Sequence, residues 1–600
     1  MNLPSPVDPD WYLGTVTQAT ATQVLVNLPQ ATARPERRSQ AKGAVGDFVF
    51  IDCERLKVLG RIIETRVADS ERLTLEPHLG AQLDPNPVGK VQLLAAIEQG
   101  STKLQRGLSA FPRIGDGVYL ANPSLLGQLL HNAVANPDER TLDIGRLDAG
   151  DGVAVSLPPE KLFGRHCGVF GATGGGKSWT IATLIQQLKA EGGKAIVFDP
   201  TGEFAEISGV DQVFGFEQGP AHHQQVHFPY RRITEDDLFS LLRPSAQSQG
   251  PKLREAITSL KLVAASNGVI PQGVTVQNGQ VIKQGASRSS FIAAVRENAA
   301  HVHSPLCNFE IINLADQIKN ECVKAVDNRN PGNFGTIDDF IASNCETLIT
   351  RVNVLLNSKE LSCIFQSNGI SLADAIENFL SDDSQGVALI SFRDVRFEHN
   401  TREVLLNIIG RHLLNLARQG KFKEQPLVVF LDEAHQFLGR IVGDEYGSTR
   451  LDAFGLIAKE GRKYGLTCVL ATQRPRDIPQ DVLSQLGTLI VHRLTNDQDR
   501  ETVERACGDL DRGAAQFIPM LAPGEAVLIG PDLPAPVPII INRPSSPPDS
   551  KGPAFQAYWK QRRDNPRPPA PAADAPVEVL VAAPPAAATP AFDLDDEIPF

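Results

Sequence analysis

The sequence predicts an α/β fold in which a large parallel sheet follows a small β-barrel and precedes a disordered tail. Three stretches that differ in the pattern and composition of their residues lead to this prediction. Residues 1–150 contain short alternating apolar segments, residues 151–544 alternate apolar runs with helical patterns, and residues 545–600 are dense in Pro and Ala. A chain of 600 residues is too long for a single hydrophobic core, so several domains are expected.

The first 150 residues are expected to form the barrel. Apolar and polar residues alternate there over short runs, and glycine-containing polar turns separate these runs. The expected strands include Leu13–Val16, Gln23–Asn27, Gly46–Ile51 and Val58–Ile63.

Residues 151–544 are expected to hold the parallel sheet, because short apolar runs alternate there with longer helical patterns. Residues from about 225 to 385 read as mainly helical and are expected to form an insert or a subdomain. The expected strands are Cys167–Phe170, Ala195–Phe198, Val387–Phe392, Leu427–Leu431, Thr467–Ala471, Leu489–Val491 and Ala526–Ile529.

Composition and charge narrow the class of protein. At 42% hydrophobic and 21% charged residues the chain is typical of globular proteins. It contains no apolar run of membrane-spanning length, and its first residues lack the basic and apolar regions of a signal peptide, so a cytoplasmic location without membrane contact is expected. A formal net charge of −12 argues against a generally basic surface. Any contact with nucleic acid is therefore expected to be local, in a groove or channel.

The stretch Gly171-Ala-Thr-Gly-Gly-Gly-Lys-Ser178 is the most informative motif. It follows an expected strand and precedes an amphipathic helix, which is the setting of a phosphate-binding P-loop. Its glycines allow successive N–H groups to point at phosphate oxygens, and Lys177 supplies a charge for the β- and γ-phosphates. A chance glycine-rich turn is the alternative. The expected nucleotide contacts here are Thr173, Gly174, Gly175, Gly176, Lys177, Ser178 and Thr180, with Ser178 also a ligand of Mg²⁺.

A second motif, Leu427-Val-Val-Phe-Leu-Asp-Glu433, supplies carboxylates at the end of an apolar run. Asp432 is expected to hold Mg²⁺ through water, and Glu433 to orient and deprotonate the attacking water. The alternative is that both acids only cap the helix that follows. No Asn-Lys-x-Asp guanine signature follows the P-loop, so the expected nucleotide is ATP.

With these motifs in place, about residues 1–544 resemble the HerA-like hexameric DNA translocases of the FtsK/HerA branch of P-loop ATPases. The resemblance implies a RecA-like core, an N-terminal barrel shared with ATP synthase subunits and a ring of six subunits around double-stranded DNA. It rests on Phe163–Ser178, Val197–Glu203, Leu431–His435, Glu460–Gly465 and Ala471–Pro475.

The resemblance also implies roles for three further residues. Arg462 is similar in position to a family arginine that reaches the γ-phosphate bound by the neighbouring subunit, and Arg165 to a second arginine near the nucleotide. For both, a surface ion pair with Glu460 or Asp432 is the alternative. Gln473 is placed like a sensor of the γ-phosphate, or else is a satisfied loop amide. Glu203 could contact the nucleotide site or cap a helix.

The last nine residues, Phe592-Asp-Leu-Asp-Asp-Glu-Ile-Pro-Phe600, raise a separate hypothesis. They resemble the acidic C-terminal tip of bacterial single-stranded-DNA-binding proteins, and residues 545–591 read as a flexible linker. The tip would dock on proteins that recognise the tails of those binders. The alternative is a solubilising acidic tail.

Together these patterns predict an ATP-driven translocase or helicase for double-stranded DNA. The resemblance implies a partner nuclease or another effector, in DNA end processing or in defence against invading DNA. A rival prediction from a different class is an ATP-gated oligomeric scaffold that assembles an effector enzyme and does not translocate DNA.

Overall fold

The structure, a computed structural model, divides the chain into two compact units, Met1–Asp549 and Ser550–Phe600, which are considered separately. The described residues are 5–31, 42–67, 86–98, 101–136, 138–147, 152–266, 272–366, 369–396, 400–438, 441–444, 447–507, 512–549 and 554–564.

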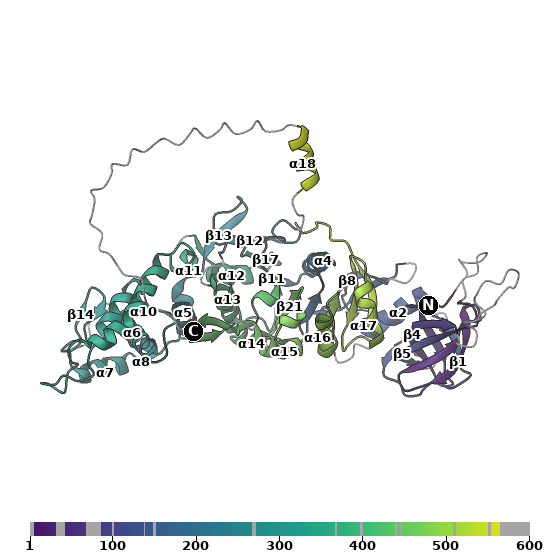
Figure 1. Ribbon diagram of the computed structural model, residues 1–600, viewed down its shortest axis with the longest axis horizontal. Coiled ribbons are helices and arrows are strands. Elements are labelled where there is room, and N and C mark those ends of the chain that lie inside the picture. Colours follow the sequence, from purple (N-terminus) through teal and green to yellow (C-terminus); the bar gives the residue numbers. More distant parts are fainter. Residues whose placement is uncertain are drawn as a thin grey trace, which may run out of the picture. The chain divides into compact units, whose positions relative to one another are not determined.

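The N-terminal strands of the first unit close into a small barrel, as the alternation predicts (Figure 1). Neighbouring strands follow the order β2-β1-β7-β3-β4-β5, and antiparallel pairing of β2 with β5 closes the barrel. At Gly14 an added Cβ would lie 1.8 Å from the carbonyl oxygen of Asn27, so the approach of β1 to β2 requires glycine. The strands are β1 (Tyr12–Ala19), β2 (Gln23–Asn27), β3 (Phe48–Asp52), β4 (Leu56–Val67), β5 (Pro87–Glu98), β6 (Gln105–Arg106) and β7 (Gly117–Leu120).

The core of this unit is a 13-stranded sheet in the order β16-β13-β12-β17-β11-β18-β21-β10-β22-β23-β24-β8-β9. Pairs from β16 to β22 are parallel, and the remaining pairs are antiparallel. All seven strands expected from the sequence are present, as β10 (Cys167–Phe170), β11 (Lys194–Asp199), β17 (Val387–Ser391), β18 (Leu427–Leu431), β21 (Leu466–Thr472), β22 (Thr488–Val491) and β23 (Glu525–Ile529).

The central strands are buried on both faces, which explains their continuous apolar runs. Along β11, Ala195 and Val197 pack into one hydrophobic cluster, whereas Ile196 and Phe198 pack into another. The first cluster includes the inward side of α4 (Lys177–Ala190), and the second includes that of α13 (Thr401–Arg418). The sheet is therefore covered by helices on both sides, as a parallel α/β sheet requires.

Strands β8 (Leu142–Leu147) and β9 (Ala154–Leu157) belong to the core sheet, where Arg146 pairs with Ile540 of β24 (Val537–Ile541). The domain boundary expected at residue 150 therefore lies inside the sheet, and the barrel ends with β7. Alternation alone does not separate antiparallel barrel strands from the antiparallel edge of a larger sheet, and this is why the prediction missed the boundary.

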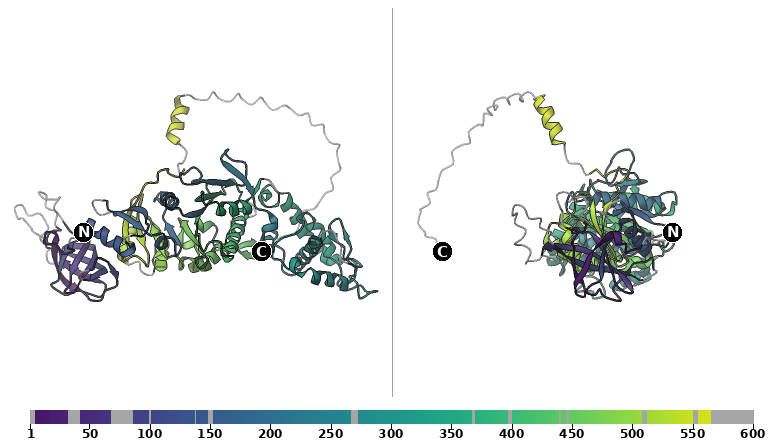
Figure 2. Two further views of the ribbon diagram at one scale, coloured as in Figure 1. Left: turned by 180° about the vertical axis from the view of Figure 1, so that it is seen from behind. Right: turned by 90° about the vertical axis from the view of Figure 1, so that its right-hand side faces the viewer.

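The region from about 225 to 385 is mainly helical, as predicted, and its helices lie together (Figure 2). Its short strands β13 (His223–His227) and β16 (Ile370–Ser371) extend the core sheet next to β12 (Gln212–Gly215). The helices are α5 (Glu235–Leu242), α6 (Gln249–Ala265), α7 (Arg288–Glu297), α8 (Ala299–Val302), α9 (Leu314–Glu321), α10 (Asp339–Asn357), α11 (Ser362–Phe365) and α12 (Leu372–Ser381), with the hairpin β14 (Val276–Gln277) and β15 (Gln280–Val281).

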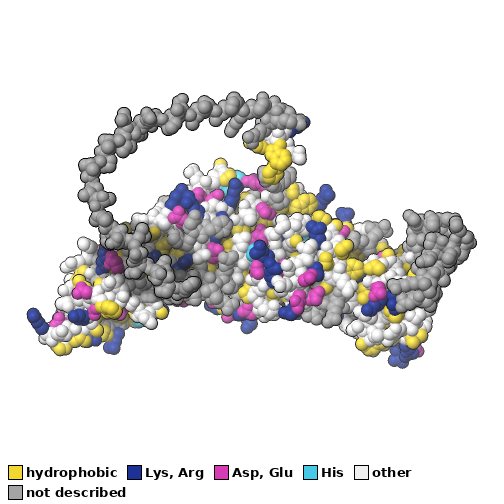
Figure 3. Space-filling view, viewed as in Figure 1, with side chains coloured by type: hydrophobic (Ala, Val, Ile, Leu, Met, Phe, Trp, Pro, Cys, Tyr) yellow, Lys and Arg dark blue, Asp and Glu magenta, His cyan; other side chains and the backbone are white. Residues whose placement is uncertain are grey.

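The remaining elements connect the sheet strands or follow them. They are α2 (Pro123–Val134), α3 (Pro159–Leu162), β19 (Ile441–Asp444), β20 (Gly447–Arg450), α14 (Ala453–Glu460), α15 (Gln480–Leu483), α16 (Asp497–Cys507) and α17 (Arg512–Phe517). Among the described residues, no helix is both long and apolar enough to cross a membrane. On the face shown in Figure 3, acidic and basic side chains are interspersed among the described residues.

The expected linker 545–600 differs in part from the structure. Ser545 belongs to the first unit, where its backbone N–H donates a hydrogen bond to Gln186 Oε1 at 2.9 Å. In the second unit, residues Phe555–Asp564 form helix α18. The prediction that these residues belong to a disordered linker is therefore wrong. They contain no proline, and the rings of Phe555 and Trp559, one turn apart, are in contact with centroids 5.6 Å apart and planes tilted by 59°. The acidic tip 592–600 lies outside the described residues.

Candidate nucleotide-binding and hydrolysis site

A glycine-rich loop joins β10 to α4 and forms the candidate phosphate cradle. Gly174 and Gly176 adopt φ angles of 74° and 114°. Residues that have a Cβ atom rarely adopt such positive φ angles. A Cβ on Gly176 would also meet the backbone nitrogen of Gly524 at 3.0 Å. These glycines let the chain turn directly into α4, so that the first N–H groups of the helix and its positive dipole end face the loop.

The elements around this loop bring further polar residues to one edge of the sheet. In the sheet, β10, β21, β18 and β11 are parallel neighbours. Their carboxyl ends therefore meet at the same edge, where ligand sites form in open α/β sheets. This carboxyl edge carries the P-loop after β10, Gln473 after β21, Asp432 and Glu433 after β18, and Glu203 after β11.

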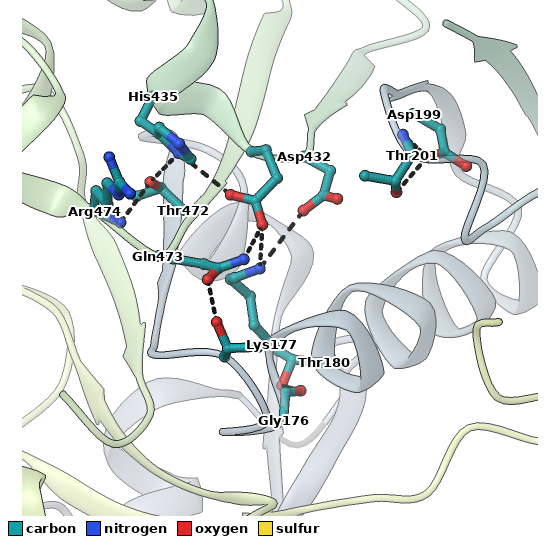
Figure 4. A network of polar contacts seen from close by, with 12 residues as sticks. Gly176, Lys177, Thr180, Asp199, Thr201, Asp432, His435, Thr472, Gln473 and Arg474 are labelled. Carbon is teal, nitrogen blue, oxygen red and sulfur yellow. Dashed lines mark hydrogen bonds and ion pairs between the residues drawn. The ribbon is translucent and has the colours of Figure 1, made fainter. Parts of the chain in front are cut away.

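Lys177 is the centre of the polar network in Figure 4. Its side chain is buried, and its Nζ donates a hydrogen bond to Glu433 Oε1 at 3.1 Å. The same Nζ lies 4.0 Å from Asp432 Oδ1. The ammonium group therefore lies between two carboxyl groups.

The carboxyl group of Asp432 lies where a bound cation would stabilise its charged form. Burial raises the pKa of its carboxyl to about 7, although the charge of Lys177 opposes this rise. Its Oδ1 atom is buried and has no hydrogen-bond partner among the described residues. A buried carboxylate oxygen without a partner is costly, and a bound metal ion would relieve that cost.

Glu433 is held as an ionised carboxylate. Burial favours its neutral form, but a hydrogen bond from His435, the charge of Lys177 and a hydrogen bond from Gln473 outweigh burial and lower its pKa to about 2. Its backbone has a φ of 46°, in the left-handed region. Such a conformation costs about 1–3 kcal/mol for a residue with a side chain and is typical of functional sites.

Gln473 bridges the loop and the acids. Its Nε2 donates to Glu433 Oε1, and its Oε1 accepts from the Thr173 hydroxyl, both at 2.5 Å. Thr173 is exposed in the loop, so a ligand in the cradle would lie next to this contact. The position suits a residue that couples the occupancy of the loop to the orientation of Glu433.

Glu203, left undecided by the sequence, lies at the site. Burial raises its pKa, while a hydrogen bond with the Ser178 side chain and the charge of Lys177 act in the opposite direction. The nearby Asp199 has a different task, because its oxygens accept N–H groups of Thr201, Gly202 and Phe204 and so shape the loop that carries Glu203. Hydroxyl and carboxylate oxygens from Ser178, Asp432 and Glu203 are donors that Mg²⁺ prefers, and the set fits that ion.

Thr180, expected among the nucleotide contacts, has another position. Its side chain is 1% exposed, and its hydroxyl lies 2.8 Å from His492 Nε2. Burial lowers the pKa of His492 to about 4, so the ring is neutral. It donates from Nδ1 to the Glu525 carbonyl and accepts from Thr180 at Nε2. The Thr180 side chain thus supports the cradle from behind, and the predicted contact of Thr180 with the nucleotide stays a prediction. The role of His492 was not predicted.

Arg165 and Arg462 lie far from this network. They line a pocket of about 600 Å³ together with Lys463. Arg165 precedes β10 and Arg462 precedes β21, so both belong to the amino edge of the parallel sheet. The 7 residues of β21, or about 23 Å at the usual rise per residue, separate Arg462 from the carboxyl edge.

The ion pairs considered for these arginines are not formed. Glu460 instead pairs with Arg418, at 3.0 Å. Among the described residues, neither Arg462 nor Arg165 has an ion-pair partner. Both are exposed and keep their charge available for an anion that comes from outside the chain.

Comparisons with known proteins agree with this site. A family model described as "Helicase HerA, central domain" matches residues 142–304, and one described as "Helicase HerA-like C-terminal" matches residues 328–528. The matched ranges contain the glycine-rich loop and the acidic pair, respectively.

Full-length relatives and solved structures are similar over most of the chain. The DNA double-strand break repair helicase HerA of Pyrococcus furiosus is 24% identical over 500 residues, covering 82% of this chain and 84% of the relative. The protein of the same name from Sulfurisphaera tokodaii is 23% identical over 537 residues, covering 86% and 92%. The structure of VirB4 of Thermoanaerobacter pseudethanolicus, 13% identical, superposes with a TM-score of 0.44 over 68% of this chain and 97% of that one.

Proposed function

Because this chain belongs to the HerA-like family of P-loop ATPases, we propose that it is a motor that hydrolyses ATP to move along double-stranded DNA. One observation carries the proposal. Lys177, Asp432 and Glu433 meet beside the P-loop at the carboxyl edge, whereas Arg462 and Arg165 stand with free charges at the amino edge. The chain thus carries one part of a hydrolysis site at each edge of its sheet.

The carboxyl edge would bind ATP together with Mg²⁺. The loop N–H groups and Lys177 would hold the phosphates, and Ser178 and Asp432 would hold the metal, with Glu203 beside them. The metal, when bound, neutralises charge on the β- and γ-phosphate oxygens. Gln473 would sense the γ-phosphate through its contact with Thr173.

Glu433 is proposed as the general base that takes a proton from the attacking water. In the structure its carboxylate is paired with Lys177, which keeps it ionised but weakly basic. A phosphate in the cradle would compete for the Lys177 ammonium and so leave Glu433 with fewer partners. Its pKa would then rise, which strengthens the base when the substrate is in place.

Arg462 and Arg165 are proposed to act on the nucleotide of a neighbouring subunit. Within one chain, Arg462 is separated from the P-loop edge by the length of β21. A head-to-tail arrangement of subunits places the amino edge of one chain against the carboxyl edge of the next, and repeated contacts of this kind close into a ring. We propose a hexamer, by analogy with the family.

A mixed-assembly experiment tests this arrangement. Subunits with Arg462→Ala retain Glu433, and subunits with Glu433→Gln retain Arg462. If the arginine acts across the boundary, mixing the two inactive variants creates some junctions with both groups and restores part of the ATPase activity. Mixed assemblies that form but stay inactive would contradict the arrangement.

DNA and a partner effector complete the proposal. A net charge of −12 leaves the lining of a central channel as the place for contacts with DNA phosphates. The relatives named above are DNA double-strand break repair helicases, which favours a role in DNA end processing with a partner nuclease. Defence against invading DNA with another effector uses the same motor.

The acidic tip 592–600 is proposed as a docking segment for proteins that recognise the tails of single-stranded-DNA-binding proteins. Its Asp and Glu side chains suit a basic surface, and Phe600 suits an apolar pocket. Phe600→Ala should reduce the recovery of such repair proteins in a pull-down with the purified full chain. Equal recovery with both chains would leave the tip as a solubilising tail.

Motor activity is separable from the rival scaffold function. A translocase should hydrolyse ATP faster with duplex DNA than without it, and should displace a protein block bound to that duplex. Glu433→Gln is the matched control, because it should bind nucleotide and DNA but displace nothing. DNA-independent hydrolysis without displacement would favour an ATP-gated scaffold.

A further inference from the structure

An exposed tryptophan stands next to the phosphate cradle. Trp179 lies in the first turn of α4, two residues after Lys177, and 36% of it is exposed to solvent. The core-facing residues of this helix are others, namely Ile181, Leu184 and Ile185. Trp179 is therefore not part of the hydrophobic core, and its ring is accessible to a planar ligand group.

Trp179 lies in the first turn of α4, at the end of the helix that faces the phosphate cradle. Cα–Cβ bonds in a helix tilt toward its N-terminus, and the N-terminus of α4 is the P-loop. Figure 4 shows Lys177 at this start of the helix, with its side chain directed toward the acids. A nucleotide with its phosphates in the loop extends its ribose and base out of the cradle, and Trp179 is the aromatic side chain in the adjoining first turn of α4.

Arg543 provides a second group at the same place. Its guanidinium carbon lies 5.9 Å from the centroid of the Trp179 ring, within the range of a cation–π contact. The segment that carries it is fixed along α4, because the Thr183 hydroxyl donates to the Asn542 carbonyl at 2.9 Å. Arg543 is exposed and has no ion-pair partner among the described residues, so its planar group remains available.

We infer that Trp179 and Arg543 form a stacking platform for the base of the bound nucleotide. The inference rests on the proposed nucleotide site and adds the element that binds the base. Aromatic rings and guanidinium planes stack on the face of any base, so the platform adds affinity without distinguishing adenine from guanine. A purine offers more stacking area than a pyrimidine, and ATP and GTP should therefore bind more tightly than CTP and UTP.

Comparison of ATP with inorganic tripolyphosphate tests the platform, because tripolyphosphate fills the cradle but carries no base. Binding of each to the full chain with Mg²⁺ is measured by calorimetry. Trp179→Ala should weaken ATP binding at least about fivefold and leave tripolyphosphate binding unchanged. Trp179→Phe, the matched control, should keep most of the ATP affinity. Arg543→Ala should weaken ATP binding in the same selective way but to a smaller extent.

Fluorescence gives a second measurement that needs no loss of binding. The chain has 3 tryptophans, so the double variant Trp11→Phe, Trp559→Phe leaves Trp179 as the sole tryptophan, which is excited selectively at long ultraviolet wavelengths. ADP should change its emission through contact with the base, and tripolyphosphate should not.

The outcomes separate this inference from the proposed function. If the wild-type chain binds neither ATP nor tripolyphosphate, the nucleotide site itself is wrong, and the platform with it. If the wild type binds both and Trp179→Ala binds ATP equally well, only the platform is overturned. Equal weakening of both ligands also overturns it, because Trp179 would then support the cradle and not the base.

Discussion

The two edges of the core sheet carry charged residues in opposite states. At the carboxyl edge, Lys177 and Glu433 are buried and already paired with each other. At the amino edge, Arg462 and Arg165 are exposed and unpaired among the described residues. An edge with satisfied charges can fold and bind on its own, whereas unpaired arginines around a pocket require an external anion. The difference supports the proposal that the chain supplies both halves of a site that closes only between subunits.

The strongest way to break this comparison is to remove the amino-edge charge. Arg462→Ala should lower kcat for ATP about a thousandfold or more, since the arginine would stabilise charge that develops in the transition state. Nucleotide affinity of the isolated chain should stay close to that of wild type, because the carboxyl edge is intact. Steady-state ATPase assays and nucleotide titrations measure the two effects. Lys463→Ala, a neighbour in the same pocket, is the matched control and should lose far less activity.

The carboxyl edge is tested by Glu433→Gln. The variant keeps the shape of the side chain but removes the proposed base, and kcat should fall about a hundredfold or more. ATP should remain bound without turnover, as measured by single-turnover assays with labelled ATP. Near-normal kcat would show that another group takes the proton.

The pH dependence sharpens the role of Asp432. Its pKa, raised to about 7 by burial, means that protons compete with the metal below pH 7 and much less above it. Apparent Mg²⁺ affinity should therefore fall up to about tenfold for each pH unit below 7 and level off above. Asp432→Asn should bind Mg²⁺ weakly with little change over this range. Metal titrations from pH 5.5 to 8.5 measure the slope, and a flat wild-type profile would contradict the assignment.

The raised pKa of Asp432 also makes the stability of the folded state depend on pH. The folded state keeps its proton up to about pH 7, above the ordinary carboxyl value, so the protonated group favours the fold at low pH. This contribution is lost as the pH rises toward 7. Bound Mg²⁺ should then restore stability above pH 7, which thermal melts with and without the metal can measure.

The smallest expected effect concerns the support behind the cradle. Thr180→Val keeps the volume but leaves His492 Nε2 without its hydrogen-bond donor, at a cost of about 1–3 kcal/mol in the free energy of unfolding. Denaturant unfolding measures the cost, and kcat should change little because the Thr180 hydroxyl contacts His492. A large loss of ATP binding with normal stability would show that the Thr180 hydroxyl does contact the nucleotide.

Most of the fold could be predicted because its strands are buried on both faces. The apolar runs of β10 and β18 were found at their observed bounds, since parallel strands read as continuous apolar segments. The strands β12 and β24 were missed because β12 is only four residues long and Pro538 interrupts the apolar run of β24. The helix α18 was missed because the proline-rich composition around it dominated the prediction.

The candidate site divides in the same way. Lys177, Ser178, Asp432 and Glu433 belong to contiguous motifs whose chemistry can be identified in one chain. Glu203 and His492 could not be assigned, because neither belongs to a motif that fixes its partner. The contact of Thr180 with His492 was not predicted, since a helix position near the P-loop does not by itself tell which way the side chain points.

The sequence alone therefore determined the kind of chemistry, because a phosphate-binding loop and an acidic strand end are local arrangements of backbone and side chains. Only the tertiary structure determined at which edge of the sheet each charged residue lies. It placed the paired lysine and acids at one edge of the sheet and the unpaired arginines at the other. This placement depends on which strands are parallel neighbours, a long-range property that no local sequence pattern contains.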